Sequence, residues 1–127
     1  MLPFAIQIVA GGPIAEQIVY AVKRAVVSGQ LGPGDKFPSV RVLSQELRIN
    51  PNTAHRVVAA LVEEGVLVAT PAVGTVVAEN VAGNREEKAA LLGPAVEKLV
   101  VEAKNLGVPL EQVQRALEKH WRELDRK

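Results

Sequence analysis

The stretch that most constrains the fold runs from Pro38 to Val58, where two short helical patterns are separated by a brief break. Ser39 suits the N-cap of the first helix, because its hydroxyl oxygen can accept a free backbone N–H there. Asn50 suits the N-cap of the second, and Pro51 then takes the first helical position, where proline costs a helix least. The second helix opens with small polar residues instead of an apolar ridge. We therefore expect its opening turns to be exposed and to meet a partner.

The segments around this stretch complete a recognisable order of elements. Residues 4–9 are β-prone and predict an extended arm, and a helix is expected from Pro13 to Ser28. After the second helix, β-like runs at 66–69 and 75–78 are joined by a tip at 70–74. Helix, helix, turn, helix and hairpin is the order of a winged helix-turn-helix.

Apolar residues at helical spacing define the face of each helix that we expect to be buried. They are Ile14, Ile18, Val22, Ala25, Val26, Val40, Leu43, Leu47, Ala54, Val57, Val58, Leu61 and Val62.

The C-terminal third of the chain predicts two helices after a linker at residues 80–84. A helical stretch over 85–106 contains Gly93-Pro94, where we expect a kink or a break, and Pro109 opens the last helix. Two apolar stripes in so short a tail cannot bury themselves well alone, so we expect a second copy of the chain to cover them. The residues expected at this dimer interface are Leu92, Val96, Leu99, Ala103, Leu106, Leu110, Val113, Leu117, Trp121 and Leu124.

Composition excludes several classes of protein. The absence of cysteine rules out disulfides and thiolate metal sites, and His55 and His120 lie too far apart in sequence to suggest a local metal site. No apolar run approaches the roughly 20 residues that span a bilayer, and the first ten residues do not resemble a signal peptide. The serines have no evident histidine and acid partners for nucleophilic catalysis. We expect a cytoplasmic protein that is not an enzyme and needs no metal or cofactor.

The polar opening of the second helix points to DNA. Asn52 can pair with a base edge as asparagine does with adenine, Thr53 suits a phosphate, and Arg56 suits a phosphate or guanine. His55 adds an imidazole whose charge follows pH. Taken alone, the pattern favours a capping turn with a solvated arginine. The break before it and the hairpin after it favour DNA.

With these residues in view, the chain resembles the GntR family of bacterial transcriptional regulators, specifically its short YtrA-like branch. The resemblance covers roughly residues 4–78. The motifs that carry it are Pro13 to Ile18, Gly29 to Arg41, Ile49 to Thr53, Glu63 to Leu67, and Gly74-Thr75.

The resemblance implies a homodimeric repressor on an inverted-repeat operator in double-stranded DNA. The helix that begins at Asn50 would lie in the major groove and the hairpin in the neighbouring minor groove. Arg41 matches an arginine that commonly contacts DNA in the family, although Asp35 or Glu46 could pair with it instead. Pro51 and His55 stand where larger relatives often carry arginines. The tip at 70–74 has no Lys or Arg, which puts a strong charge contact from the hairpin in doubt.

The sequence therefore predicts a mainly α fold, with a winged helix-turn-helix DNA-binding domain over residues 1–79 and a two-helix dimerisation tail over 80–127. The residues expected to bind DNA are Ser39, Arg41, Asn50, Asn52, Thr53, His55, Arg56, Gly74 and Thr75. Two alternatives stay open. One is a small-molecule sensor with a pocket between the helical tails, whose effector is unknown, and the other is a protein-interaction module.

Overall fold

The computed structural model describes residues 2–79 and 83–125 of the 127-residue chain. Two compact units divide these residues, one within 2–79 and the other within 83–124. The fold class expected from the sequence is confirmed, because the described elements are helices with one small antiparallel sheet. In chain order they are α1 (Ile14–Val27), α2 (Val40–Leu47), α3 (Pro51–Glu63), β1 (Leu67–Thr70), β2 (Gly74–Val77), α4 (Arg85–Ala90), the π-helix η1 (Leu91–Ala95), α5 (Val96–Leu106) and α6 (Leu110–Glu123).

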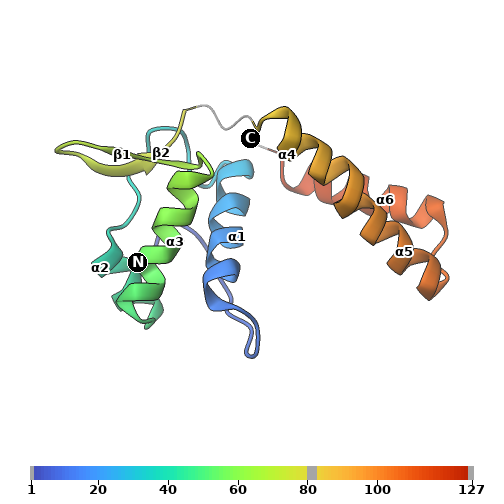
Figure 1. The fold of residues 1–127 in the computed structure, drawn as a ribbon, viewed down its shortest axis with the longest axis horizontal. Helices are drawn as coiled ribbons and strands as arrows, with labels where there is room; N and C mark the ends of the chain where they lie inside the picture. The colour runs from blue at the N-terminus through green and yellow to red at the C-terminus, as the bar shows by residue number, and fades with distance from the viewer. Residues whose placement is uncertain (1, 80–82, 126–127) are drawn as a thin grey trace. The chain divides into compact units, whose positions relative to one another are not determined.

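The first unit packs α1 and α2 against α3, and Figure 1 shows α1 and α3 side by side. Its core is largely aliphatic, as the low aromatic content predicts, and Ile18, Leu43 and Leu61 are wholly buried. Two aromatic side chains join this core: the rings of Phe4 and Phe37 stack with their centroids 5.8 Å apart. This core fixes α3 on its inner side and leaves its outer side to solvent.

Two residues expected in the core are exposed instead. Ile14 is 42% exposed, because it begins α1 and extends past the end of the core although it shares the stripe of Ile18. Val62 is 38% exposed, because each residue turns an α-helix by 100°, which carries Val62 away from the buried face at Leu61.

The N-terminal arm packs against the first unit as predicted. Phe4 is buried, and Leu2 and Ile6 pack against the core. Further along, the side-chain amide of Gln17 on α1 forms hydrogen bonds with both the N–H and the C=O group of Val9. Val9 N–H donates to Gln17 Oε1 over 2.7 Å, and Gln17 Nε2 donates to Val9 O over 3.1 Å. The arm is thereby fixed to α1 without forming a strand of the sheet.

The hairpin has a third segment along one edge that the sequence did not predict. β1 and β2 pair from Leu67 with Val77 to Thr70 with Gly74, one residue away from the expected bounds at all four strand ends. Residues 34–37 lie along β2: Phe37 N–H donates to Thr75 O over 2.8 Å, and Val77 N–H donates to Asp35 O over 2.9 Å. The turn expected before α2 therefore also braces the hairpin of β1 and β2, which is the wing of the fold.

The second unit begins at a capping box. The Asn84 side chain accepts from Glu87 N–H over 2.8 Å, while the Glu87 carboxylate accepts from Asn84 N–H over 3.0 Å. Asn84 was expected to end a linker; it is instead the N-cap of α4, and residues 80–82 of that linker lie outside the described residues.

The helix that follows is not broken at Pro94. Val96 N–H bonds to Leu91 O five residues back, and the backbone on both sides of η1 keeps right-handed helical angles. Proline cannot donate a backbone hydrogen bond and clashes with the preceding turn of an α-helix, and a π-helical segment relieves both problems. The expected interruption is thus a π-helical segment within a helix that continues from α4 to α5.

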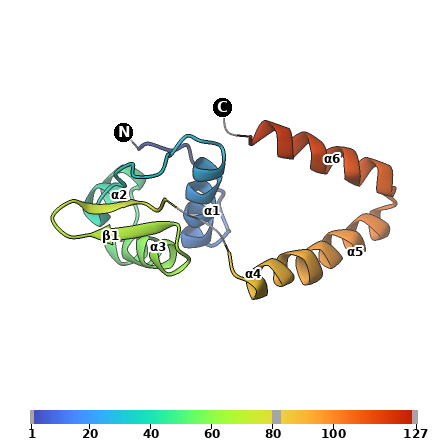
Figure 2. The ribbon, with the colours of Figure 1, turned by 90° about the horizontal axis from the view of Figure 1, so that it is seen from above.

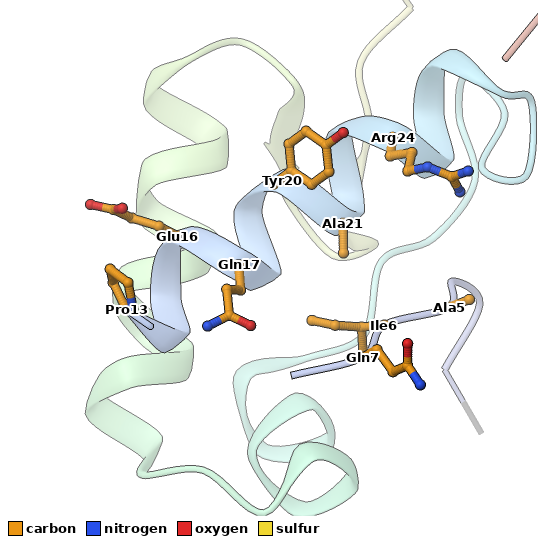
Figure 3. Close-up of a pocket in the computed structure, with 9 residues that line it drawn as sticks. All are labelled: Ala5, Ile6, Gln7, Pro13, Glu16, Gln17, Tyr20, Ala21 and Arg24. Carbon is orange, nitrogen blue, oxygen red and sulfur yellow. The ribbon is translucent and has the colours of Figure 1, made fainter. Parts of the chain in front are cut away.

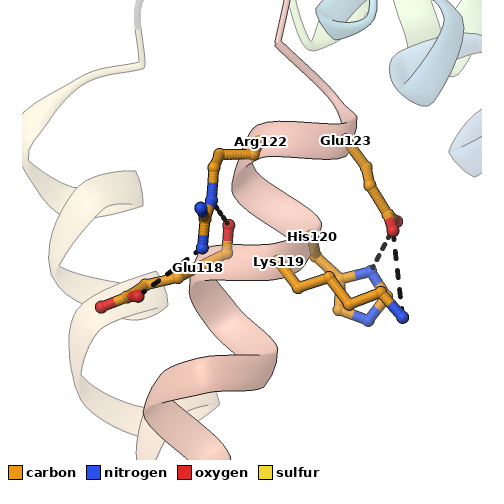
Figure 4. A network of polar contacts seen from close by, with 5 residues as sticks. All are labelled: Glu118, Lys119, His120, Arg122 and Glu123. Carbon is orange, nitrogen blue, oxygen red and sulfur yellow. Dashed lines mark hydrogen bonds and ion pairs between the residues drawn. The ribbon is translucent and has the colours of Figure 1, made fainter.

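Helices α5 and α6 diverge from the turn at Gly107 (Figure 2). Glu118 with Arg122 and Glu123 with Lys119 and His120 form exposed pairs along the polar side of α6, at 3.8 to 4.0 Å (Figure 4). Exposed pairs of this kind each contribute only about 0.5 kcal/mol. These pairs keep this side of α6 polar, but they lie within α6 and do not attach it to another helix.

Candidate nucleic-acid interface

Both predicted caps in the helix-turn-helix are present. Ser39 Oγ accepts from Val42 N–H over 3.2 Å at the start of α2. Asn50 Oδ1 accepts from Asn52 N–H over 2.8 Å at the start of α3. Capping uses one oxygen of each side chain, and the NH2 group of Asn50 remains available to donate. The caps fix where α3 begins and therefore which side chains its first turn presents.

Three of the predicted DNA-binding side chains share one exposed face of α3. Asn52, His55 and Arg56 fall within about 100° of each other around the helix and lie opposite Ala54 and the rest of the buried face. Thr53 is half-buried and lies on the side of α3 that faces α1. A ligand that approaches the outer face of α3 meets an amide, an imidazole and a guanidinium.

The side chains that could reach a ligand are not engaged elsewhere. Arg41 is exposed near the start of α2, and its guanidinium makes no hydrogen bond or ion pair with any described residue. Asp35, one of its possible partners, accepts from Gly32 N–H over 2.8 Å instead. The side chains of Asn52, His55 and Arg56 likewise have no partner in the parts of the chain that the structure describes.

Arg56 differs from its neighbours in what lies beside it. It lines a hollow of about 390 Å³ between α1 and α3, together with Tyr20 and Lys23 of α1. Lys23 pairs with Glu64 at the C-terminal end of α3, which ties the two helices together. Arg56 thus stands at the α1 edge of the exposed face, and His55 lies about 100° around the helix from it.

The wing brings two predicted residues to its second strand. Gly74 has a φ of 99°, which L-residues avoid, and a Cβ there would meet no atom within 4 Å. Glycine is therefore required at this position because of the backbone angle, and not because a side chain would lack space. Thr75 is half-buried, and its carbonyl accepts from Phe37. Lys36, exposed beside Val76, puts one cation near the base of a wing whose tip has none.

Another hollow lies on α1 between the helix and the N-terminal arm. It has a volume of about 650 Å³, and Figure 3 shows Ile6 and Gln7 of the arm on one side and Tyr20, Ala21 and Arg24 of α1 on the other. None of the predicted DNA-binding residues lines it.

The second unit exposes an apolar surface. A groove of about 480 Å³ between α5 and α6 is lined by Leu99, Ala103, Leu106, Val113 and Leu117, with Glu102 and His120 among its polar members. None of the ten residues expected at the dimer interface is buried in the single chain. The most exposed of them are Leu92 at 72%, Leu106 at 76% and Trp121 at 78%.

Arg48 is not among the residues that the sequence predicts to bind DNA. The structure shows it in the left-handed region, with φ 54° and ψ 49°, at the junction of α2 and α3. The signal that could have identified it is the absence of glycine at the end of α2, since helices often end with glycine in this conformation. Among the described residues, no cluster of His, Cys, Asp or Glu is suited to a metal ion. No helix in those parts of the chain is long and apolar enough to cross a membrane.

Comparison with known proteins places the chain among regulators. Residues 14–77 match the family described as bacterial regulatory proteins, gntR family. The chain is 34% identical over 102 residues to the HTH-type transcriptional repressor YtrA of Bacillus subtilis (strain 168), covering 80% of this chain and 78% of that protein.

Solved structures agree over most of the chain. A transcriptional antiterminator from Listeria monocytogenes EGD-e superposes with a TM-score of 0.82 at 26% identity, over 95% of this chain and 91% of that one. YtrA from Sulfolobus acidocaldarius, a GntR-family transcription factor, superposes with a TM-score of 0.53 at 25% identity, over 91% of this chain and 97% of that one.

Proposed function

The chain belongs to the GntR family of DNA-binding transcriptional regulators, and from this premise we propose that it is a repressor that binds an inverted-repeat operator as a homodimer. The family and the matched relatives are regulators and not enzymes, which confirms that expectation from the sequence. A repressor role is supported by the name of the Bacillus subtilis relative. Residues 1–79 bind DNA in this proposal and residues 80–127 join the subunits, at work in the cytoplasm.

The observation that carries the proposal is the exposed, unengaged face of α3. Asn52 and His55 project from its first two turns, and Arg41, exposed near the start of α2, pairs with none of the residues described in the structure. An α-helix fits the major groove, where an asparagine amide can donate to and accept from one adenine. In this arrangement Asn52 and His55 read base edges, and Arg41 and Arg56 hold the flanking phosphates.

The remaining predicted residues position the protein on the DNA backbone. Ser39 and Thr53 lie in the first turns of α2 and α3, where unpaired N–H groups and the helix dipole favour a phosphate. Gly74 and Thr75 bring the wing's backbone toward the minor groove. Because the wing tip has no cation, one copy of this surface would bind weakly, and two linked copies would be needed for useful affinity.

The apolar face of the tail supports the homodimer. Leucines and a tryptophan that are 55–78% exposed on α5 and α6 form a surface that a lone chain would leave in water. A two-fold interface lets the same face of each copy cover the other. Such a dimer would hold two α3 helices at a fixed spacing, as an inverted repeat requires.

The groove between α5 and α6 also favours a second candidate, a small-molecule sensor. Its lining is mostly apolar, with Glu102 and His120 as the polar members, which suits an apolar ligand with a polar group. A thermal-shift screen of such ligands, followed by operator binding with each hit, distinguishes the two functions. A hit that changes operator affinity supports the sensor, and hits without such an effect leave the groove as part of the dimer interface.

Salt titration of DNA binding tests the proposed function. Affinity for duplex DNA should fall steeply as salt rises, since each neutralised phosphate releases counterions. Asn52→Ala should reduce preference for the operator over scrambled DNA at least tenfold, about 1.4 kcal/mol, whereas Asn105→Ala, the same change on an exposed position of α5, should leave that preference intact. Binding to duplex DNA that does not depend on salt would contradict the proposal and favour a protein-interaction module.

A further inference from the structure

The end of α2 adopts a backbone conformation that favours glycine but contains arginine. Arg48 has φ 54° and ψ 49°, and Ile49 N–H donates to Ser44 O over 3.1 Å, which closes a Schellman motif. This motif needs a left-handed residue after the helix. Glycine adopts that conformation freely, while any other side chain brings its Cβ too close to the following backbone.

The same chain uses glycine at its other helix ends of this kind. The left-handed residues that follow α1, α3 and α5 are Gly29, Gly65 and Gly107, with φ between 74° and 84°. Among the described helices, α2 alone ends in a left-handed residue with a side chain. The backbone would accept glycine here too, so the fold does not explain the arginine. A backbone outlier of this kind is a reason to look for a function of its side chain.

The guanidinium of Arg48 has no structural task in the first unit. It is exposed, and it makes no hydrogen bond or ion pair with any residue that the structure describes. Its place is informative, because it lies two residues before Asn50, the cap of α3. Consecutive Cα atoms are about 3.8 Å apart, so the Cα atoms of Arg48 and Asn50 are at most about 7.6 Å apart. A long side chain that starts there reaches the surroundings of the first turn of α3.

We propose that Arg48 contacts a DNA phosphate at the edge of the groove that α3 enters. This inference rests on the proposed function. The guanidinium is suited to the role because its planar donors match phosphate oxygens two at a time. A positive charge at this position also complements the rest of the surface, because the wing tip has no cation and Arg56 lies at the α1 edge of α3. A phosphate contact positions the protein and reads no sequence, so Arg48 contributes alike on operator and other DNA.

Arg48→Gly in the full chain tests this proposal, because it should change stability and binding in opposite directions. Relief of the left-handed strain should raise the Tm of the first unit by roughly 2–5 °C. Loss of the phosphate contact should weaken binding about tenfold. The slope of log affinity against log salt should become shallower by about 0.9 for each bound protomer. These losses should be equal on a labelled duplex carrying the selected operator and on a scrambled duplex.

Three variants control the test. Ala72→Gly relieves the other left-handed side chain in the described chain, at φ 66°, and should raise the Tm without changing the salt slope. Arg48→Lys should keep the slope, because the charge remains. Arg48→Asn, which tolerates the left-handed region but has no charge, should make the slope shallower by the same amount as Arg48→Gly does.

The outcomes separate this inference from the proposed function. Unchanged affinity and salt slope in both Arg48→Gly and Arg48→Asn, with normal binding by the unaltered protein, would overturn the role of Arg48 alone. Failure of the unaltered protein to bind either duplex would overturn both. A loss confined to the operator duplex would show that Arg48 reads bases, and it would overturn the phosphate contact.

Discussion

Leu117 on α6 gives the most direct prediction about the tail. Its side chain is 55% exposed in the single chain and lines the groove between α5 and α6. Complete burial of a leucine side chain is worth about 2 kcal/mol. If a second copy of the chain buries the exposed half of Leu117, the gain is about 1 kcal/mol per protomer, or about 2 kcal/mol per two-fold dimer. Leu117→Ala should raise the dimer dissociation constant about 30-fold.

Leu117→Glu should have a larger effect, because it would bury an unpaired carboxylate in the interface, and it should give monomers. Lys119→Ala on the polar side of α6 is the matched control. Its pair with Glu123 is exposed at 4.0 Å, so the dissociation constant should change less than about twofold. Sedimentation equilibrium measures both constants, with circular dichroism to confirm that each variant is helical. A folded, dimeric Leu117→Glu protein would refute the interface.

Three further predictions concern the first unit. Arg41→Ala and Arg56→Ala should each weaken operator binding at least tenfold while sedimentation still shows dimers; full binding by both would refute this assignment. Asn50→Ala removes the cap of α3 and should lower stability by about 1 kcal/mol in urea unfolding, along with operator affinity. Leu61→Ala opens a cavity in a wholly buried part of the core and should cost roughly 3 kcal/mol, and a loss below about 1 kcal/mol would contradict its packing.

The helix-turn-helix could be predicted because its signals are local. Ser39, Asn50 and Pro51 each specify a helix start through their own chemistry, and the structure places all three as expected. The pairing of Lys36 with Val76 could not be predicted, because it joins residues far apart in sequence and the segment around Lys36 reads only as a turn. The exposure of Ile14 likewise depends on where the core ends, which no local pattern specifies.

The tail shows a different limit of sequence reasoning. The pattern around Pro94 predicts that an α-helix must be interrupted there, but not that a π-helical segment will absorb the proline. The apolar stripes could be predicted from their spacing, yet what covers residues such as Trp121 depends on a second chain. For the proposed DNA-binding face, the residue types are evident from the sequence. The turning of Arg56 toward α1 and the left-handed Arg48 emerged only from the fold.

Selection of bound sequences from random duplex DNA, with the mass of the resulting complex, tests the central claim most directly. We predict an inverted repeat whose half-sites have centres one helical turn apart, about 10 base pairs, or a multiple of that spacing. The complex should contain two protomers per duplex. Enrichment of a single unrepeated half-site bound by one protomer, or of no sequence at all, would contradict the homodimeric repressor.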